Sequence, residues 1–388
     1  MKILQVVGSM NCGGVETWLM HVLRGIDRTK MQVDFLVHSD EAQTYREEAT
    51  LLGARFFNCG NPNRFVQYAR DFRRVLREYG PYDVVHSHLH HFNGVALFLA
   101  YIFGVPVRIN HVHSDLARKE STVSPMRKAY LWFCKHCARH YATGGLACSR
   151  QAAPYMFGAK WEHDTRCQVL YCGIDLSPFS HRIERAEVRD SLEVPRDAFV
   201  IGHVGRFEQA KNHRFLVEVF VQVLRKKPGA ILLLIGDGPL RPEVEHKVGV
   251  LGLRGSVRFL GVRLDVPRLM GAMDTLAFPS LYEGLGLVIL ESQAAGLPAV
   301  VAANVPPEAD VVPELIQRLD VKEGSQRWAD ALLSVSNSSS ILRQRGFAAI
   351  EQSHFNIMCS VEQLTEFYLD AVARHARLVP QRPRSLEA

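Results

Sequence analysis

Residues 279–291 have the sequence Pro-Ser-Leu-Tyr-Glu-Gly-Leu-Gly-Leu-Val-Ile-Leu-Glu, directly after an apolar run at 275–278. A short apolar run, a glycine-containing turn and a second apolar run together predict a strand, a loop and a helix. We expect the strand at 275–278 and the helix from about Gly284 to Ala295. Units of this kind, repeated along a chain, are typical of a parallel α/β sheet that binds ligands at the carboxyl ends of its strands.

Two acidic residues, Glu283 and Glu291, lie eight positions apart in this segment. On one helix they would be separated by roughly 80° and about 12 Å along the axis. That is too far for two carboxyl groups acting on one bond, which need roughly 5–9.5 Å. It suits a long ligand with hydroxyls at both ends. An ordinary buried helix with two polar contacts is the alternative.

The segment between the two carboxylates is a candidate anion site. Free backbone amides at a helix N-terminus attract negative charge. A hydroxyl, an anion and a second hydroxyl in this order describe a nucleotide sugar. The candidate binding residues are Gly284, Leu285, Gly286 and Leu287.

The pattern Glu-x7-Glu, after Pro-Ser-x-Tyr and before Gly-Leu-Pro at 296–298, resembles the signature of glycosyltransferase family 4, the glycogen synthase-like enzymes. The resemblance implies a retaining, metal-independent transferase with the α/β fold called GT-B. In that fold two Rossmann-like parallel-sheet domains face each other across a cleft. It also implies that Glu283 contacts the donor sugar and Glu291 the ribose of the nucleotide.

The length of 388 residues favours two domains, because one hydrophobic core rarely serves so long a chain. We place an acceptor-side domain at 1–180 and a donor-binding domain at 181–360. Charge rises and signals of order fade at 180–197, so the linker is expected there. An amphipathic helix at about 361–378 is expected to pack back on the first domain, as GT-B chains do.

The first predicted strand, Ile3–Val7, leads into a loop that contains Gly13, Gly14 and Glu16. Paired glycines at a strand-to-helix turn let the backbone approach a phosphate closely. A plain tight turn is the alternative, since the loop is not a GxGxxG motif. The family resemblance implies that this Gly-Gly-x-Glu turn lies against the donor phosphates.

Histidines follow two further predicted strands, Val84–His86 and Val107–Asn110. The segment 86–91, His-Ser-His-Leu-His-His, places three of them on one face, a spacing that makes metal ligation conceivable. The resemblance implies instead that His86 and His88 line the cleft. His111 and His113 alternate along the next strand, so we expect only one of them to face the ligand. We favour His111, as a hydrogen-bonding or proton-transferring group, and a structural histidine remains the alternative.

Arg206 and Lys211 lie five positions apart, after an apolar run that begins at Phe199. An Arg fork and a Lys point charge could converge on a diphosphate and stabilise it as a leaving group. The family's Gly-Arg-x4-Lys-Asn matches this place residue for residue. Because the chain contains no Asp-x-Asp, we expect this cationic pair to replace a metal, with no cofactor required. By resemblance, Val262 and Arg263 lie in a loop that packs on the nucleobase.

The excess of positive charge lies in the first half of the chain. Residues 1–180 hold 21 Lys and Arg against 15 Asp and Glu, a difference of +6, whereas 181–388 hold 25 of each. A basic run at 118–139 is interleaved with aromatic residues, which suits an anionic membrane surface. A solvated helix face is the alternative. Nucleic acid is not expected, because no binding motif accompanies the basic residues.

No membrane-spanning segment is predicted, and eight scattered cysteines fit a reducing cytosol. We therefore expect a cytoplasmic protein that contacts the inner face of the plasma membrane. The segment 304–309, Asn-Val-Pro-Pro-Glu-Ala, replaces a glycine-rich turn common in the family. This variant resembles the branch that makes exopolysaccharide and capsule.

The predicted activity is transfer of a sugar from a UDP-sugar to a glycan or a polyprenyl-diphosphate-linked acceptor. Two other functions fit the same architecture. A nucleotide-sugar 2-epimerase would consume the donor without an acceptor. A non-catalytic sugar-nucleotide-binding module would bind UDP without turnover.

Overall fold

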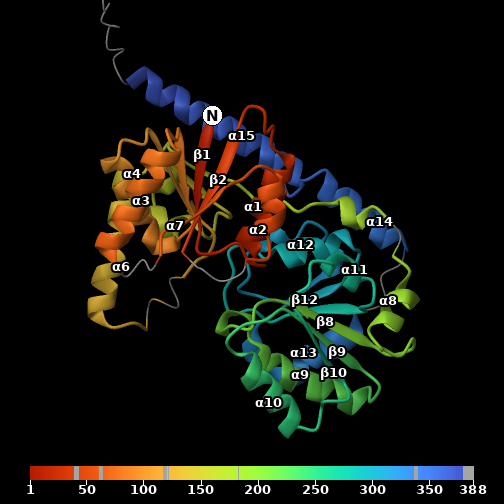
Figure 1. Cartoon of the computed structure of the whole chain (residues 1–388). Helices are drawn as coiled ribbons and strands as arrows, with labels where there is room; N and C mark the ends of the chain where they lie inside the picture. Colours follow the sequence, from red (N-terminus) through yellow and green to blue (C-terminus); the bar gives the residue numbers. More distant parts are fainter. Residues whose placement is uncertain are drawn as a thin grey trace, which may run out of the picture. The chain divides into compact units, whose positions relative to one another are not determined.

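The computed structural model describes residues 1–38, 43–60, 64–116, 120, 122–181, 183–335 and 340–378. The chain divides into two compact units (Figure 1). Unit 1 contains Met1–Asn11, Val22–Leu170 and the chain from Ser360 on. Unit 2 contains Cys12–His21 and Tyr171–Cys359.

Unit 1 is built on a parallel sheet in the order β3-β2-β1-β4-β5-β6-β7. Its strands are β1 (Lys2–Val6), β2 (Gln32–Val37), β3 (Phe56–Asn58), β4 (Val84–Ser87), β5 (Val107–Val112), β6 (Gly144–Ala147) and β7 (Cys167–Val169). Its longer helices are α1 (Gly14–Gly25), which starts in unit 2, α2 (Arg46–Leu51), α3 (Phe65–Tyr79), α4 (Asn93–Ile102), α6 (Pro125–Tyr141), α7 (Ala153–Phe157) and the C-terminal α15 (Ile357–Leu378).

The two faces of this sheet carry different side chains because successive residues of a strand point to opposite sides. On one face Leu4 and Val6 of β1 pack with Phe72 of α3 and Leu97 of α4. Helices α3, α4 and α6 lie on the same side of the strands in Figure 1. On the other face, the intervening Gln5 meets Tyr368 of α15. The sheet is therefore apolar toward α3 and α4 and partly polar toward α15.

Unit 2 has a parallel sheet in the order β10-β9-β8-β11-β12-β13. Its strands are β8 (Val200–Val204), β9 (Ile231–Ile235), β10 (Val257–Gly261), β11 (Thr275–Phe278), β12 (Ala299–Ala302) and β13 (Ile316–Leu319). Its helices include α8 (Arg185–Ser191), α9 (His213–Lys226), α10 (Arg241–Val250), α11 (Val266–Met270), α12 (Leu287–Ala294), α13 (Gly324–Ser334) and α14 (Ser340–Glu351). Helix α9 packs beside α13, and α12 packs beside α14.

Both sheets have a topological switch point, where the order of the strands reverses. In unit 1 it lies between β1 and β4, and in unit 2 between β8 and β11. The connections on the two sides of such a point leave a crevice beyond the carboxyl ends of the strands, and ligands of open α/β sheets bind there. The loops after β1, β4, β8 and β11 are therefore the first places to look for function.

The predicted parallel α/β architecture is confirmed, and the strand at 275–278 has the predicted bounds. The predicted start of the following helix is wrong. Helix α12 begins at Leu287, because Gly286 has a φ of +90°, which is left-handed and cannot continue a right-handed helix. Glu283 therefore precedes the helix, and the spacing of about 12 Å expected along one axis does not apply.

The segment predicted as a linker, 180–197, contains helix α8. Arg189 of this helix is buried and bonds Asp274 Oδ2 at 2.9 Å, and the same oxygen accepts from the backbone amide of Val200 at 2.7 Å. The charges that suggested a solvated linker thus fix α8 against the amino end of the unit 2 sheet. Within the described residues, none of the helices combines the length and apolarity needed to cross a membrane.

Candidate active site

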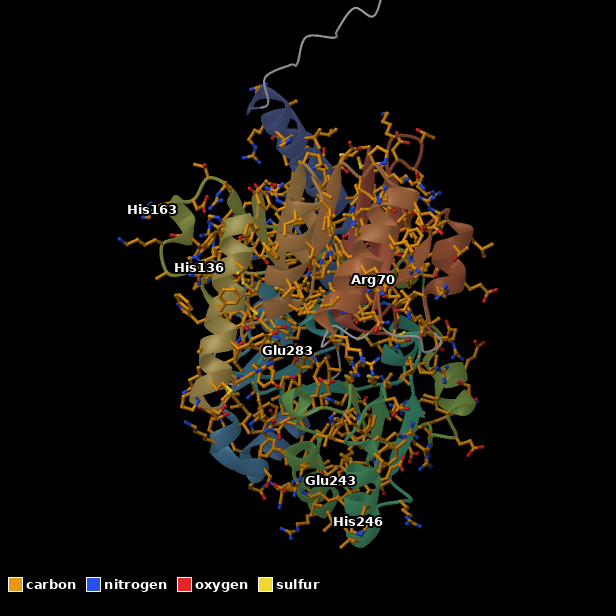
Figure 2. The ribbon with its side chains drawn as sticks, turned by 60° about the vertical axis from the view of Figure 1, so that its left-hand side comes forward. Arg70, His136, His163, Glu243, His246 and Glu283 are labelled. Carbon is orange, nitrogen blue, oxygen red and sulfur yellow. The ribbon has the colours of Figure 1, made fainter. Side chains whose placement is uncertain are left out.

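Lys211 and Glu283 meet at the switch point of unit 2. Lys211 Nζ lies 2.6 Å from Glu283 Oε1, and the two side chains are 19% and 13% exposed. The ammonium group also lies over the ring of Phe278, 4.8 Å from its centroid. Glu283, labelled in Figure 2, follows β11, whereas Lys211 follows β8. Residues 72 positions apart are thus brought into one charge-assisted hydrogen bond.

Backbone bonds fix the two loops that hold this pair. The amide of Leu281 donates to the carbonyl of Ala210 at 2.7 Å. The side chain of Asn212, in a left-handed conformation with φ +56°, donates to the carbonyl of Pro279 at 3.3 Å. Lys211 ends a short 3₁₀ turn, Gln209–Lys211, which points the lysine toward the β11 loop. The sequence Lys-Asn therefore matters locally, because Asn tolerates the left-handed conformation better than most residues.

Glu291 lies on α12 and is only partly exposed. Burial raises the pKa of its carboxyl group to about 7. The preceding Gly284 and Leu285 are buried, and Gly286 caps the helix. The structure therefore offers a carboxyl group that can be ionised or neutral near pH 7, one helical turn after the glycine-containing loop.

The paired glycines lie near the start of α12, within unit 2. A Cβ added to Gly14 would lie 3.9 Å from Leu287 Cδ1, and one added to Gly13 would lie 2.3 Å from Glu16 Oε2. Glu16 thus folds back over Gly13, and a side chain at position 13 would require the Glu16 carboxylate to move. Burial raises the pKa of Glu16 to about 7, although the charge of Arg206 acts in the opposite direction.

Arg206, Val262 and Arg263 have other surroundings. Arg206 is exposed, with Nε 3.1 Å from Glu208 Oε1. Arg263 makes two bonds of 2.7 Å to Asp265, and Val262 is 48% exposed. Arg206 and Lys211 therefore have different carboxylate partners in this structure. Their convergence on a diphosphate, and the contact of Val262 and Arg263 with a nucleobase, stay predictions.

The histidines of unit 1 form a buried cluster at the other switch point. His86 Nε2 lies 3.1 Å from His111 Nδ1, and His88 Nδ1 lies 2.8 Å from His113 Nε2. Burial, the largest cause for each of the four, holds their pKa values well below the ordinary range, with neighbouring histidines adding to the effect. At neutral pH these four rings are uncharged.

The expectation that only one of His111 and His113 faces a given side is wrong. Their ring centroids are 3.9 Å apart, and both rings approach that of His88. The reason is that side chains two positions apart on a strand point to the same face, so His111 and His113 lie together and only Val112 between them points away. His90, in contrast, leaves its strand and begins a 3₁₀ helix, so the run at 86–91 does not form one extended face.

Gln5 and Tyr368 join this cluster and were not predicted. Gln5 bonds both His88 and Tyr368, and Tyr368 also bonds His86. Gln5 could have been identified from the sequence, because a glutamine in the middle of the apolar strand Ile3–Val7 is unusual. Tyr368 could not, because nothing in the amphipathic pattern of the C-terminal helix distinguishes it.

Two further buried histidines, His203 and His213, lie near Lys211. His213 stacks on Phe207 with centroids 4.0 Å apart, and His203 contacts His213 edge-on at 4.6 Å. Burial lowers the pKa of His203 to about 4 and that of His213 to about 2, and the charge of Lys211 contributes in the same direction. His213 therefore behaves as an uncharged aromatic ring at neutral pH.

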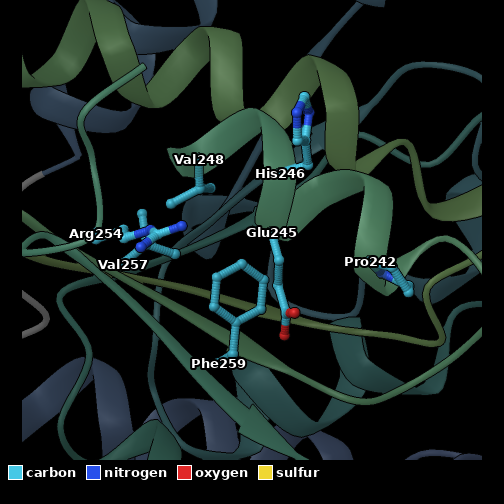
Figure 3. A pocket seen from close by; sticks show the side chains of 7 residues that line it. All are labelled: Pro242, Glu245, His246, Val248, Arg254, Val257 and Phe259. Atoms are coloured by element: carbon cyan, nitrogen blue, oxygen red, sulfur yellow. The ribbon is translucent and has the colours of Figure 1, made fainter. Parts of the chain in front are cut away.

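A separate cavity of about 430 Å³ lies between α10 and the edge strand β10 (Figure 3). It is lined by Pro242, Glu245, His246, Val248, Arg254, Val257 and Phe259. None of these is a predicted site residue, although β10 ends just before Val262. The cavity is therefore not part of the cluster around Lys211 and Glu283.

Two Rossmann-like parallel-sheet units, with charged and hydrogen-bonding side chains gathered at their switch points, are the architecture of the GT-B fold. Residues 184–351 match the family model of glycosyl transferases group 1, and residues 12–178 match that of Glycosyltransferase Family 4. The chain belongs to glycosyltransferase family 4.

Relatives of known name agree with this assignment. A protein of Bacillus subtilis (strain 168) named glycosyltransferase EpsF is 33% identical over 337 residues, covering 85% of this chain and 86% of that protein. The UDP-Gal:alpha-D-GlcNAc-diphosphoundecaprenol alpha-1,3-galactosyltransferase of Escherichia coli is 24% identical, covering 91% of this chain and 96% of that protein.

Solved structures share the fold. Anabaena Alr3699/HepE, in complex with UDP and glucose, has a TM-score of 0.78 at 22% identity and covers 95% of this chain and 100% of its own. WaaG, a glycosyltransferase involved in lipopolysaccharide biosynthesis, has a TM-score of 0.69 at 18% identity and covers 98% of this chain and 100% of its own.

Proposed function

We propose that this protein transfers a hexose from a UDP-sugar to a glycan or polyprenyl-diphosphate-linked acceptor, with retention at the anomeric carbon, in exopolysaccharide synthesis. The name of the Escherichia coli relative supports the acceptor class, and the segment 304–309 resembles the branch of the family that makes exopolysaccharide. The HepE structure, which contains UDP, supports the donor class.

The observation that supports this proposal best is the contact between Lys211 and Glu283. A diphosphate attracts the ammonium group of a lysine more strongly than a single carboxylate does, because it carries at least two negative charges. When the donor binds, Lys211 turns to the diphosphate and Glu283 becomes available to accept hydrogen bonds from sugar hydroxyls. Without donor, Lys211 and Glu283 therefore bind each other, with Nζ 2.6 Å from Oε1.

The reaction breaks the bond between the anomeric carbon and the β-phosphate oxygen, and forms a bond between that carbon and an acceptor hydroxyl oxygen. The electron pair of the broken bond stays on the diphosphate, where negative charge grows. Lys211 stabilises that charge in a partly buried place, where electrostatic stabilisation is stronger than in water. The hydroxyl proton passes to the departing phosphate oxygen on the same face of the sugar, which retains the configuration. No covalent nucleophile is assigned.

Other residues hold the nucleotide. Glu291, with its raised pKa, accepts hydrogen bonds from the two ribose hydroxyls. We expect the phosphates to approach the backbone at Gly13 and Gly14 and at the loop from Gly284 to Gly286. Arg206, beside Glu16, adds a second cation. We expect the main chain at Val262 and Arg263 to contact the base.

We also propose that the reaction needs no divalent cation. The sequence contains no Asp-x-Asp, the usual carboxylate pair for a metal-held diphosphate. Lys211 and Arg206 supply positive charge at the same step. Activity is expected to persist in excess chelator, and a loss that Mn²⁺ restores would contradict metal independence.

Helix α6 supports a peripheral contact with an anionic membrane at the cytoplasmic face. Met126, Trp132 and Phe133 are 85%, 68% and 59% exposed, and Lys128 is exposed beside them. His136 marks this helix in Figure 2. Two basic residues of the predicted patch have other partners, since Lys135 bonds Glu120 and Arg139 bonds a backbone carbonyl. Arg118, the first residue of that patch, lies outside the described residues.

The deciding experiment measures UDP or GDP release from a panel of UDP- and GDP-sugars, with and without a polyprenyl-diphosphate-linked sugar. Release from one UDP-sugar that rises sharply with the acceptor is the expected result. Consumption of the donor without any acceptor, with inversion at C2, would indicate an epimerase. Binding of UDP with no turnover of any donor would indicate a binding module.

A further inference from the structure

Six polar side chains of unit 1 form one continuous chain of hydrogen bonds. Each of them is at least 90% buried, and they come from β1, from the ends of β4 and β5, and from α15. The members are Gln5, His86, His88, His111, His113 and Tyr368. Five hydrogen bonds join six groups, so the role of one member as donor or acceptor fixes the role of the next.

The first branch runs from Gln5 to His111. Gln5 Nε2, which can only donate, bonds Tyr368 Oη at 3.0 Å. The hydroxyl proton of Tyr368 is then directed to His86 Nδ1, 2.7 Å away. A neutral ring that accepts at Nδ1 carries its proton on Nε2, and His86 Nε2 donates to His111 Nδ1 at 3.1 Å. His111 therefore carries its proton on Nε2.

The second branch runs from Gln5 to His113. Gln5 Oε1, which can only accept, is 2.8 Å from His88 Nε2, so the proton of His88 is on that nitrogen. His88 Nδ1 must then accept from His113 Nε2, 2.8 Å away. His113 keeps a lone pair on Nδ1. One glutamine thus sets the tautomers of both branches, because its amide has one donating and one accepting end.

The geometry and burial agree with neutral rings. The rings of His86 and His111 are nearly parallel, with an angle of 6° and centroids 5.1 Å apart, and their facing nitrogens are within hydrogen-bond distance. An added proton would convert an accepting nitrogen into a donor and break a bond of the chain. Burial also opposes that charge.

We propose that Gln5 and Tyr368 are positioning residues that hold His111 as the Nε2–H tautomer and His113 as an acceptor at Nδ1. His111 is then a hydrogen-bond donor at Nε2 rather than a general base. The use of this donor for a hydroxyl of the substrate rests on the proposed function, whereas the tautomers do not.

The test uses long-range ¹H–¹⁵N correlation spectra of the full chain with ¹⁵N-labelled histidines. The spectra are assigned by removing one histidine at a time. All four rings should be neutral and protonated on Nε2 at pH 7.5. An Nδ1–H tautomer or an imidazolium at His111 would overturn the proposal. So would a stoichiometric metal ion on this cluster, since three of its rings have nitrogens within 4.8 Å of one another.

Two variants separate the branches. Tyr368→Phe keeps the ring but removes the donor to His86, so the Nε2–H population of His111 should fall while His113 is unchanged. Gln5→Leu removes both anchors, so both histidines should change. Unchanged spectra in a folded Tyr368→Phe protein would refute the positioning role. Because that variant alters a single hydroxyl, it gives a result even if Gln5→Leu does not fold.

The matched control is Tyr82→Phe. Tyr82 is also buried in unit 1, and its hydroxyl donates to Asp34 Oδ2 at 2.7 Å, but it precedes β4 and lies at the amino end of the strands. It should leave the histidine spectra unchanged.

With an active donor and acceptor pair, Tyr368→Phe should lower kcat about tenfold, the size of one lost hydrogen bond, with little change in the donor KM. An equal loss of kcat in Tyr82→Phe would mean that the effect is only structural. Absence of turnover in every protein, with the expected spectra, would reject the proposed function and leave the positioning network intact.

Discussion

The two units have the same kind of sheet and the same kind of switch point, but they place opposite chemistry there. In unit 1 the carboxyl ends of β4 and β5 hold four uncharged imidazoles joined by hydrogen bonds. In unit 2 the carboxyl ends of β8 and β11 hold an ammonium group paired with a carboxylate. Fold alone therefore does not decide what a switch point does, because the side chains after the strands do.

This difference has a physical meaning for the transfer of a sugar. Charge develops on the diphosphate, so a cation is useful on the donor side. A sugar hydroxyl remains neutral until the bond forms, and neutral donors and acceptors recognise it without burying a net charge. We expect side chains of unit 2 to stabilise the charge of the diphosphate, and side chains of unit 1 to form hydrogen bonds with sugar hydroxyls.

Lys211→Ala should lower kcat by about 100-fold or more, because it removes the cation that stabilises the departing diphosphate. Steady-state kinetics with the identified donor would measure it. The matched control is Lys247→Ala, since Lys247 also pairs with a carboxylate of unit 2, Glu218, at 2.6 Å. The control should keep its activity, because exposed ion pairs contribute little. A wild-type kcat in Lys211→Ala would show that Lys211 does not stabilise the departing diphosphate.

His213 should make the protein less stable in acid. Burial lowers its pKa to about 2, so as pH falls below 6.5 the unfolded state takes up a proton that the folded state does not. This stability is complete above pH 6.5, and at pH 5 the loss is about 2 kcal/mol. Urea unfolding at pH 7.5 and pH 5 measures it as the difference between the wild type and His213→Phe, because the other buried histidines contribute to both proteins.

His213→Phe should remove that loss, because a phenyl ring can keep the stacking on Phe207. The exposed His246 offers the control, and His246→Phe should retain the acid sensitivity of the wild type. Identical pH dependence in His213→Phe and the wild type would show that His213 is not a buried neutral ring.

Glu291→Gln should weaken binding of UDP-glucose roughly tenfold at pH 8, because a charge-assisted hydrogen bond is replaced by a weaker one. Burial raises the pKa of Glu291 to about 7, and ribose hydroxyls favour the ionised form, so binding near pH 6.5 should release protons. Affinity should therefore rise with pH between 6 and 8.

Calorimetry in buffers of different ionisation enthalpy would count these protons. Glu16 also has a pKa of about 7, so Glu16→Gln is the matched comparison. If proton release on binding is unchanged in Glu291→Gln but disappears in Glu16→Gln, the group that titrates is Glu16 and not Glu291.

Replacing Trp132 and Phe133 of α6 by Ser should reduce binding to vesicles of anionic lipid several-fold, because two exposed aromatic rings lose their contact with the interface. Co-sedimentation with vesicles of phosphatidylglycerol would measure it. Leu369→Ser is the control, since Leu369 is 54% exposed on α15, outside the basic helix. Equal binding by both variants would contradict a membrane contact through α6.

Local patterns in the sequence were enough for the parallel α/β class and for most strands, because apolar runs and glycine turns act over a few residues. The strand at 275–278 shows this, and the strand predicted at Ile3–Val7 is shifted from β1 by only one residue at each end. The start of α12 could not be predicted, because it follows from the left-handed φ of Gly286, and a glycine adopts positive and negative φ about equally readily. The order in α8 could not be predicted either, because Asp274, which holds Arg189, lies 85 residues away.

The candidate side chains could be named from the sequence: Lys211, Glu283, Glu291, the glycine turn and the alternating histidines. Local patterns and the family resemblance were enough to select them. The pairing of Lys211 with Glu283, and the contacts of Gln5 and Tyr368 with the histidines, became visible in the folded structure alone. The reason is that a hydrogen bond or an ion pair depends on distance in space, and these partners are 72 and up to 363 residues apart in the chain.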